Sequence, residues 1–276
     1  MSPQATGTAL RGISAASQKD VLQAVESVDP ASAARLGAEL FSVVGVLDGA
    51  AALRRVLTDP STELEAKQGL AQSVLGGKVS EETITVVKVA ARGRWAAGRD
   101  FVDGLETAGV AALVASVDAE GRLDELETEL FEVGRTIASD GELRGVVSDR
   151  SIPREHKLTL LDRLFEGKVL PQTLELVRQA AAARTGSFER VLERFGETAA
   201  ARRQRLVALV RVAYQLGDDE QQRLTSALAG KYGRDVHLNI VVDPSVVGGI
   251  VVSVGDEVVD GTMSSRLETA RRRLAG

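Results

Sequence analysis

Apolar residues recur at every third or fourth position over most of the first two hundred residues, which predicts amphipathic helices. One such helix is expected within residues 8–27, before a break at Pro30, and a helix pair is expected on either side of a turn at Gly121. Two more helices follow the two copies of "GKV", at 77–79 and 167–169. Their apolar positions are Ile84, Val87 and Ala91 in the first and Leu174, Val177 and Ala181 in the second.

The chain also matches itself at a constant offset. Residues 36–94 align with residues 126–184 without a gap and share 21 identities in 59 positions, where composition alone gives about four. "ELF" at 39–41 recurs at 129–131, and "LR" at 53–54 recurs at 143–144. The repeat therefore predicts two homologous helical bundles in tandem.

Different residues predict the starts of two equivalent helices in the two copies. In the first copy, Thr62 and Glu65 have the spacing of a capping box. In the second copy, Pro153 is expected at the first helical position and Glu155 at the third.

Beyond about residue 205 the pattern changes to that of a mixed domain. Residues 205–214 and 235–243 are predicted strands, with a helix between them that Asp218 caps and Gly233 ends. Two short strands follow, joined by a turn at Gly255 and Asp256, and Thr262 is expected to cap a last helix. The predicted fold class is mainly α with a small α+β C-terminal domain: bundles at 1–98 and 99–205, then a mixed domain at 206–276.

Composition agrees with helical bundles. The chain is 44% hydrophobic and only 3% aromatic, so its cores are built largely from Leu, Val and Ala. The formal net charge is -5, which gives no global attraction to nucleic acid or anionic lipid. The absence of cysteine excludes disulfides and thiolate chemistry, and the N-terminal residues lack a signal-peptide pattern. No apolar run reaches the roughly 20 residues of a membrane span, so association with a membrane is expected only through a partner.

No pattern typical of a catalytic, nucleotide or metal site is found. The pair Gly248 and Gly249 leads into a strand and lacks the lysine of a phosphate-binding loop. His156 and His237 have no ligand-like neighbours, and the arginines at 202, 203, 205 and 271–273 lack an accompanying aromatic platform. The acids near the C-terminus do not have the spacing of a calcium loop, and capping is the favoured reading of Asp243, Asp256, Glu257 and Asp260. Neither a metal nor a cofactor is expected.

The stretch "VDPSVVGGIVVSVGDEVVDGTMSSRL", with "VVSDRSIPREHKLTLLDRLF" upstream, resembles the delta subunit of F-type ATP synthase, the bacterial counterpart of the oligomycin sensitivity-conferring protein. The resemblance covers roughly residues 100–276, and the first hundred residues are an additional bundle. The positions that carry it are Lys157, Asp243, Pro244, Gly248, Gly249, Gly255, Asp256, Asp260, Gly261 and Leu267.

This resemblance implies a non-catalytic stator subunit at the cytoplasmic face of the bacterial membrane, present in one copy per complex. The second bundle would bind the N-terminal helices of alpha subunits, and the C-terminal domain would hold the C-terminal end of the b subunit. By position, the helix groove of the family falls on 104–118 and 170–184. Its candidate lining residues are Val110, Leu113, Val114, Leu174, Val177 and Ala181; the competing interpretation places most of them in the core of the bundle.

Retention of Leu40, Phe41, Val87 and Ala91 in the first copy predicts a second, non-equivalent helix groove there. The competing interpretation is that this bundle grips the stalk or only stiffens the joint. Two other functions stay open on the sequence alone. One is a cytosolic helical adaptor unrelated to ATP synthase, and the other is an enzyme whose site has no recognisable motif.

Overall fold

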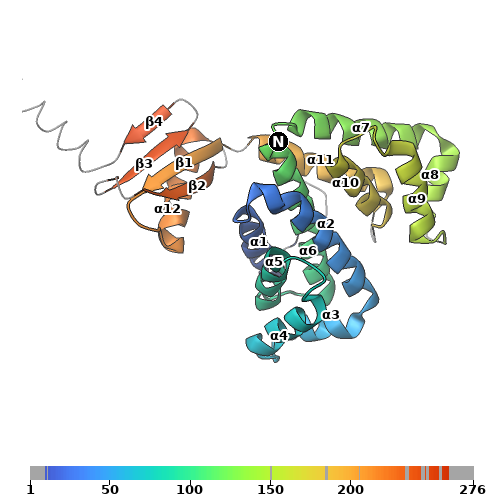
Figure 1. Cartoon of the computed structure of the whole chain (residues 1–276), viewed down its shortest axis with the longest axis horizontal. Helices are drawn as coiled ribbons and strands as arrows, with labels where there is room; N and C mark the ends of the chain where they lie inside the picture. The colour runs from blue at the N-terminus through green and yellow to red at the C-terminus, as the bar shows by residue number, and fades with distance from the viewer. Residues whose placement is uncertain are drawn as a thin grey trace, which may run out of the picture. The chain divides into compact units, whose positions relative to one another are not determined.

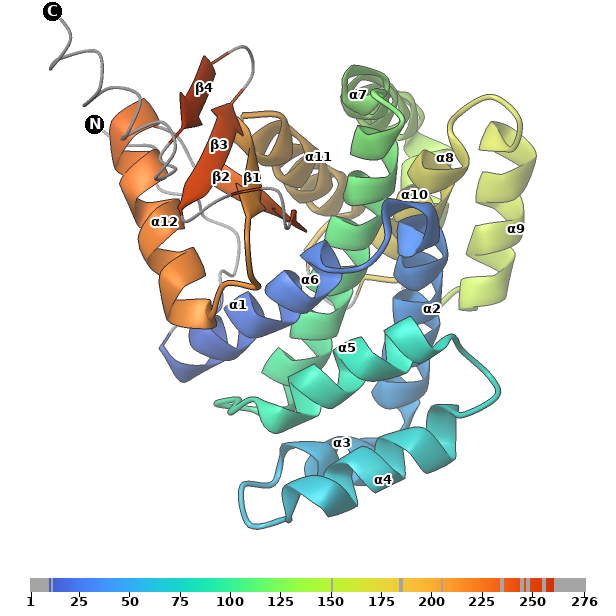
Figure 2. The same cartoon turned by 60° about the vertical axis from the view of Figure 1, so that its left-hand side comes forward.

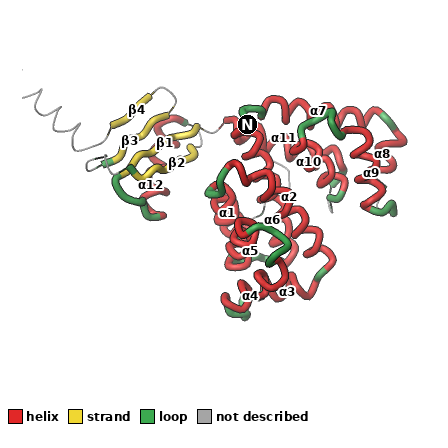
Figure 3. The backbone as a smooth tube through the Cα atoms, in the orientation of Figure 1, coloured by secondary structure: helices red, strands yellow, loops and turns green. Residues whose placement is uncertain are grey.

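The computed structural model describes residues 10, 12–149, 151–183, 186–204, 206–233, 236–243, 246, 249–254 and 257–260. The chain divides into two compact units, Met1–Ala200 (unit 1) and Ala201–Gly276 (unit 2). Where the structure describes the chain, unit 1 is built from helices and the strands belong to unit 2 (Figure 3). The predicted fold class, mainly helical with a small mixed domain, is confirmed.

Unit 1 contains the repeat found in the sequence (Figure 1). Its helices are α1 (Ile13–Glu26), α2 (Pro30–Gly49), α3 (Ala51–Thr58), α4 (Leu64–Leu75), α5 (Glu81–Arg92), α6 (Gly98–Ala119), α7 (Leu123–Ser139), α8 (Gly141–Ser148), α9 (Arg154–Phe165), α10 (Pro171–Ala181) and most of α11 (Phe188–Gln204), whose last four residues are assigned to unit 2. Shifted by 90 residues, α2 to α5 fall on α7 to α10. We call α1 to α6 copy 1 and α6 to α11 copy 2, so that α6 is counted in both.

Helix α6 belongs to both copies. The same shift places α1 within α6 and places the start of α6 on the start of α11, so α6 is at once the last helix of copy 1 and the first helix of copy 2. It packs against α1, α2, α3 and α5, and also against α7 and α10 (Figure 2). The boundary at residue 98 stays a prediction, and α6 is the element through which the two copies share their packing.

The two hydrophobic cores of unit 1 meet along this helix. Phe101, Val102 and Leu105, in the first half of α6, are buried in the core of copy 1. Val110, Leu113, Val114 and Val117, in its second half, are buried in the core of copy 2. Phe41 of α2 also belongs to the core of copy 2, although it is a copy 1 residue.

Helices α2 and α6 cross in close contact at a pair of glycines. A Cβ placed on Gly37 would lie 2.9 Å from the Gly109 carbonyl oxygen and 2.7 Å from Leu113 Cγ. A Cβ placed on Gly109 would lie 2.6 Å from Cε1 of Phe41. Only glycine at both positions lets the two backbones approach this closely, so the crossing depends on residue type and not on general hydrophobicity.

The apolar character of α2 is explained by this central position. By length and composition α2 is long and apolar enough to cross a membrane, although the sequence pattern had not suggested a span. In the structure it packs against α3, α5, α6 and α10. Its buried residues include Leu36, Leu40 and Leu47, so much of its apolar character serves packing within unit 1.

Several helix ends differ from the expectations. The start of α4 is not capped by Thr62: the helix begins at Leu64, after Glu63, and no side chain caps it. Pro153 precedes the first helical residue of α9, which is Arg154, so Glu155 is the second and not the third. The predicted turn at Gly121 is confirmed by its φ of 69°.

Unit 2 is a four-stranded sheet with one described helix against it. Its elements are β1 (Leu206–Val212), α12 (Asp218–Tyr232), β2 (Val236–Val242), β3 (Ile250–Val254) and β4 (Glu257–Asp260). The strand order is β2-β1-β3-β4, with β1 and β2 parallel and the other pairs antiparallel. Ala208, Val210 and Val252 lie on the sheet face that shares a core with Leu228 of α12.

The ends of α12 show one correction and one confirmation. Gly217, not Asp218, is the N-cap residue, and its N–H donates to Glu220 Oε2 at 3.0 Å. Gly233 ends the helix in the left-handed conformation, as predicted.

The predicted C-terminal hairpin is present. Val254 pairs with Glu257, so two residues connect β3 to β4. The predicted turn residues Gly255 and Asp256, and the last helix that Thr262 was expected to cap, lie outside the described residues.

We predict that Gly37→Ala destabilises copy 1, because the added methyl meets the backbone of α6. Overpacking of this kind costs about 1–3 kcal/mol of unfolding free energy. The measurement is urea unfolding followed by the fluorescence of Trp95, the single tryptophan, which packs edge-on against Phe101 of α6.

Gly69→Ala in α4 is the matched control, since a Cβ there meets nothing within 4 Å. It should be neutral or stabilising by about 0.5–1 kcal/mol. Equal effects of the two substitutions would contradict the proposed close crossing.

Candidate functional site

The six residues predicted to line a helix groove lie together in copy 2. Five of them are buried members of its core: Val110, Leu113, Val114, Leu174 and Val177. Ala181 is partly buried and packs against the same cluster. The structure thus brings the set together, and its role as the lining of a groove stays a prediction.

Part of this α6–α10 face is covered by a helix of the same chain. Gly37 of α2 approaches Leu113, Phe41 joins the core that contains Leu174, and α2 also contacts α10. A partner helix on this face would therefore lie next to α2.

A carboxylate fixes the corresponding helix start in each copy. Glu39 on α2 accepts hydrogen bonds at the start of α5, from Ser80 N at 2.9 Å and from Thr83 Oγ1 at 2.6 Å. Its equivalent Glu129 on α7 accepts from Leu170 N at 2.9 Å and from Thr173 Oγ1. Each glutamate satisfies an N–H that the helix start leaves free, and ties two helices together.

These contacts lower the pKa of Glu39 below its ordinary value of 4.5. Burial raises this pKa, but the hydrogen bonds from Ser80 and Thr83, with Arg35 nearby, outweigh it. Sequence reasoning noted "ELF" only as an anchor of the repeat. The sequence signal for this helix-end contact is that Glu39 and Glu129, at equivalent positions of the two copies, are both acids beside an apolar helix face.

Lys157, one of the positions that carry the family resemblance, is buried on α9. Its Nζ donates to the Val147 carbonyl oxygen at 2.9 Å, in the last turn of α8.

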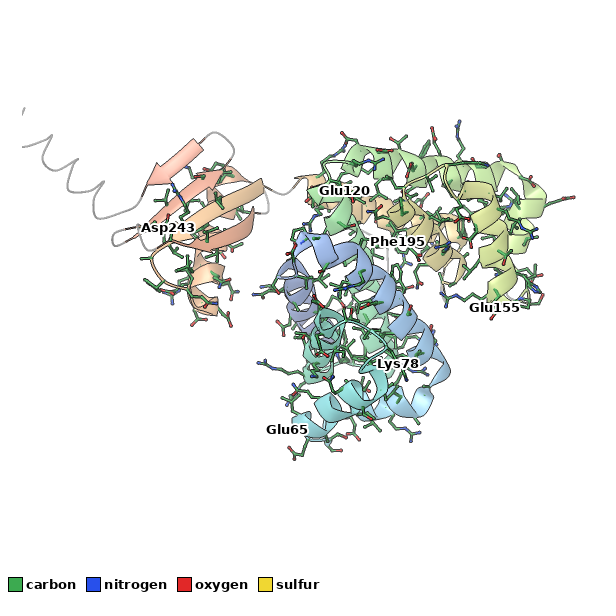
Figure 4. The ribbon with its side chains drawn as sticks, viewed as in Figure 1. Glu65, Lys78, Glu120, Glu155, Phe195 and Asp243 are labelled. Atoms are coloured by element: carbon green, nitrogen blue, oxygen red, sulfur yellow. The ribbon has the colours of Figure 1, made fainter. Side chains whose placement is uncertain are left out.

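Nearby, Asp149 accepts hydrogen bonds from Ser151 N and Oγ, both at 2.8 Å. These bonds lower the pKa of Asp149, and Lys157 adds a smaller attraction. Lys67, Asp59 and Ser61 are the equivalent residues of copy 1, and the Asp59–Ser61 contact recurs there. Figure 4 shows Glu65 on α4 and Glu155 on α9, the equivalent acids of the two copies.

The three signature residues of unit 2 that the structure describes, Asp243, Gly249 and Asp260, fall at strand ends. Asp243 follows β2, donates its N–H to the Val212 carbonyl oxygen at 2.8 Å and accepts from Val246 N at 3.0 Å. Gly249, just before β3, has a φ of 138°, which side chains with a Cβ rarely adopt. Asp260 pairs with Val251 through β4. Pro244, Gly248, Gly255, Asp256, Gly261 and Leu267 lie outside the described residues.

An open groove runs between α7 and α11 on copy 2. Its volume is about 590 Å³, and Phe131 on its wall is 71% exposed. Phe131 is the repeat equivalent of Phe41, which is 5% exposed. The pattern of apolar residues did not reveal this difference, because "ELF" is identical in the two copies.

Within the described residues, no group of three or more His, Asp or Glu side chains could hold a metal ion. His156 lies exposed on α9, and the side chain of His237 is outside the description.

We predict that Glu39→Gln destabilises copy 1 at neutral pH by about 1–3 kcal/mol, because a charged acceptor of several hydrogen bonds is lost. A lowered folded-state pKa gives stability that is present above about pH 4.5 and lost as the pH falls through the folded pKa. The difference between wild type and variant should therefore shrink below pH 4.5. Urea unfolding by Trp95 fluorescence across this range measures it.

Glu82→Gln is the control, since Glu82 makes an exposed ion pair of 3.4 Å with Arg35 among the residues that the structure describes. Such pairs contribute about 0–1 kcal/mol. A Glu39→Gln difference that stays constant with pH would argue against the assigned role.

Comparison with known proteins gives consistent matches over most of the chain. The family model described as ATP synthase delta (OSCP) subunit matches residues 110–274. "ATP synthase subunit delta" of Kineococcus radiotolerans is 43% identical over 271 residues, covering 98% of each chain. The protein of the same name from Thermobifida fusca is 42% identical over 269 residues, covering 97% of this chain and 100% of its own.

A chain from a cryo-EM structure of the Toxoplasma gondii mitochondrial ATP synthase hexamer was also matched. It is 19% identical with a TM-score of 0.28, covering 60% of this chain and 95% of its own. The relatives of full length align through copy 1 as well, so the additional bundle is shared with them. The chain belongs to the ATP synthase delta (OSCP) subunit family.

Proposed function

We propose that this chain, a stator subunit of ATP synthase, joins the catalytic head to the b-subunit stalk and so resists the torque of the rotor. The observation that carries the proposal is the family match, which extends over copy 2 and unit 2 and, in the relatives, over the whole chain. The chain itself would be non-catalytic, with one copy in each complex. It would reach the membrane only through that complex, at its cytoplasmic face.

A joint that carries torque needs rigid connections. In unit 1, α6 is continuous from the core of copy 1 to the core of copy 2, and its crossing with α2 leaves no room for a side chain between Gly37 and Gly109. Close-packed interiors transmit strain with little deformation. This supports a mechanical role for the additional bundle, as a brace against copy 2.

Contact with the head is proposed at the α6–α10 face. The N-terminal helices of alpha subunits are amphipathic in the family, and a helix can bind in an apolar groove through many dispersion contacts. Partly buried Ala181, at the end of α10, lies at the edge of that face. A second groove on copy 1 stays a prediction. Of the residues that suggested it, Leu40, Val87 and Ala91 are buried in the core of copy 1, and Phe41 is buried in the core of copy 2.

Contact with the b subunit is proposed on the exposed face of the unit 2 sheet. Leu209 on β1 is 40% exposed and Val241 on β2 is 46% exposed, while the opposite face shares its core with α12. Arg211 pairs with Val241 in the register, so an apolar patch here is bordered by a positive charge. An amphipathic helix end would bury Leu209 and Val241.

We expect Val241→Cys to form a crosslink to the C-terminal end of the b subunit in the purified complex. The chain contains no natural cysteine, so an introduced thiol is its only one. Ser226→Cys on α12, which is exposed, is the matched control. A reagent with a maleimide at one end, which reacts with the introduced thiol, and a photoreactive benzophenone at the other, which needs no thiol on the partner, is used with mass spectrometry to measure both variants.

Crosslinking of Ser226→Cys but not of Val241→Cys to the b subunit would place the stalk on the α12 side. Crosslinking of neither variant to any subunit would count against stalk binding by the described surfaces of unit 2.

A further inference from the structure

We propose that the groove between α7 and α11 is a docking site for a basic amphipathic helix of a partner protein. This surface lies entirely within unit 1 and is separate from the α6–α10 face. The proposal does not depend on which helices bind the α6–α10 face.

The groove exists because copy 2 lacks the close crossing of copy 1. The repeat equivalents of Gly37 and Gly109 are Glu127 and Ala199. Since even a methyl group at Gly37 would collide with α6, a glutamate at the equivalent position prevents the same approach of α7 to α11. The space between the two helices is the groove of about 590 Å³.

Its length and periodicity suit a helix. The lining of α7 runs from Glu127 to Ala138, and that of α11 runs from Glu189 to Ala200. At 1.5 Å per residue, each wall is about 17 Å long, or three helical turns. The floor and walls include Leu130, Leu192, Gly134 and Gly196, so a helix could approach closely.

The exposed ring of Phe131 supplies an apolar anchor. In copy 1 the equivalent Phe41 is already covered by packing against α6 and the core of copy 2. In copy 1 this phenylalanine position therefore packs against a helix, and in copy 2 the equivalent position is open. A large exposed aromatic beside a groove is typical of a binding surface.

The charge of the groove-lining residues favours a basic partner helix. The groove is lined by four carboxylates, of Glu127, Glu189, Glu193 and Glu197, and by one guanidinium, of Arg135. Lysines or arginines flanking the apolar stripe of a bound helix would complement this excess of negative charge. An acidic helix would be repelled.

The first experiment uses the purified complex. With benzoylphenylalanine in place of Phe131, irradiation should crosslink one helical segment whose charged residues are mainly Lys and Arg. The same probe in place of Val46, an exposed apolar residue of α2, is the control and should not capture that segment. Capture of an acidic segment, of a small molecule or lipid alone, or of nothing would overturn the proposal.

The second experiment uses the full-length chain and two synthetic amphipathic helices, one with leucine and lysine and the other with leucine and glutamate. The lysine helix should bind, more weakly as salt increases, and the glutamate helix should not. Phe131→Ser should weaken binding by roughly tenfold or more, as loss of an anchor does. Glu193→Gln with Glu197→Gln should weaken it severalfold, and Glu142→Gln on α8 should have no effect.

These variants change exposed or groove-lining side chains, and circular dichroism verifies that they fold. Equal binding of the two helices, or unchanged binding by Phe131→Ser, would overturn the proposal.

Discussion

The crossing of α2 and α6 at Gly37 and Gly109 is the contact on which the arrangement of unit 1 depends. A side chain at either glycine would meet backbone or an aromatic ring at less than 3 Å. Because the backbones meet there, Phe41 of α2 reaches the core of copy 2, and one continuous helix serves both copies. A repeat that could have given two separate bundles gives a single compact unit instead.

The two copies show how one sequence pattern serves two purposes. Glu39 and Glu129 keep the same helix-end contacts, and Asp59 and Asp149 the same turn. These contacts are local, so they survive duplication. The two copies differ at one phenylalanine position. Phe41 is covered by packing against α6, whereas its equivalent Phe131 is exposed. Under the proposed function, copy 1 would act as a brace and copy 2 would present surfaces to partners.

Much of the fold could be predicted from the sequence, because helical periodicity, the offset of 90 and strand alternation are local signals. The sharing of α6 could not, since the ungapped match ends before that helix and the decisive residues, Gly37 and Gly109, differ from their equivalents. The order of strands in unit 2 was also inaccessible, because alternation identifies a strand and not its neighbour. The predicted lining residues were found together, but Phe41 of α2 also joins their core, and no local pattern indicates this contact.

Hydrogen exchange of the native full-length chain tests most directly the claim that α6 unites the two copies. The account predicts one opening free energy for the amides of residues 102–108, of residues 110–117 and of α2. These segments should share it because neither of the two cores that meet along α6 opens alone. Distinct opening free energies for the two halves of α6, with the first half following α5 and the second following α10, would contradict it.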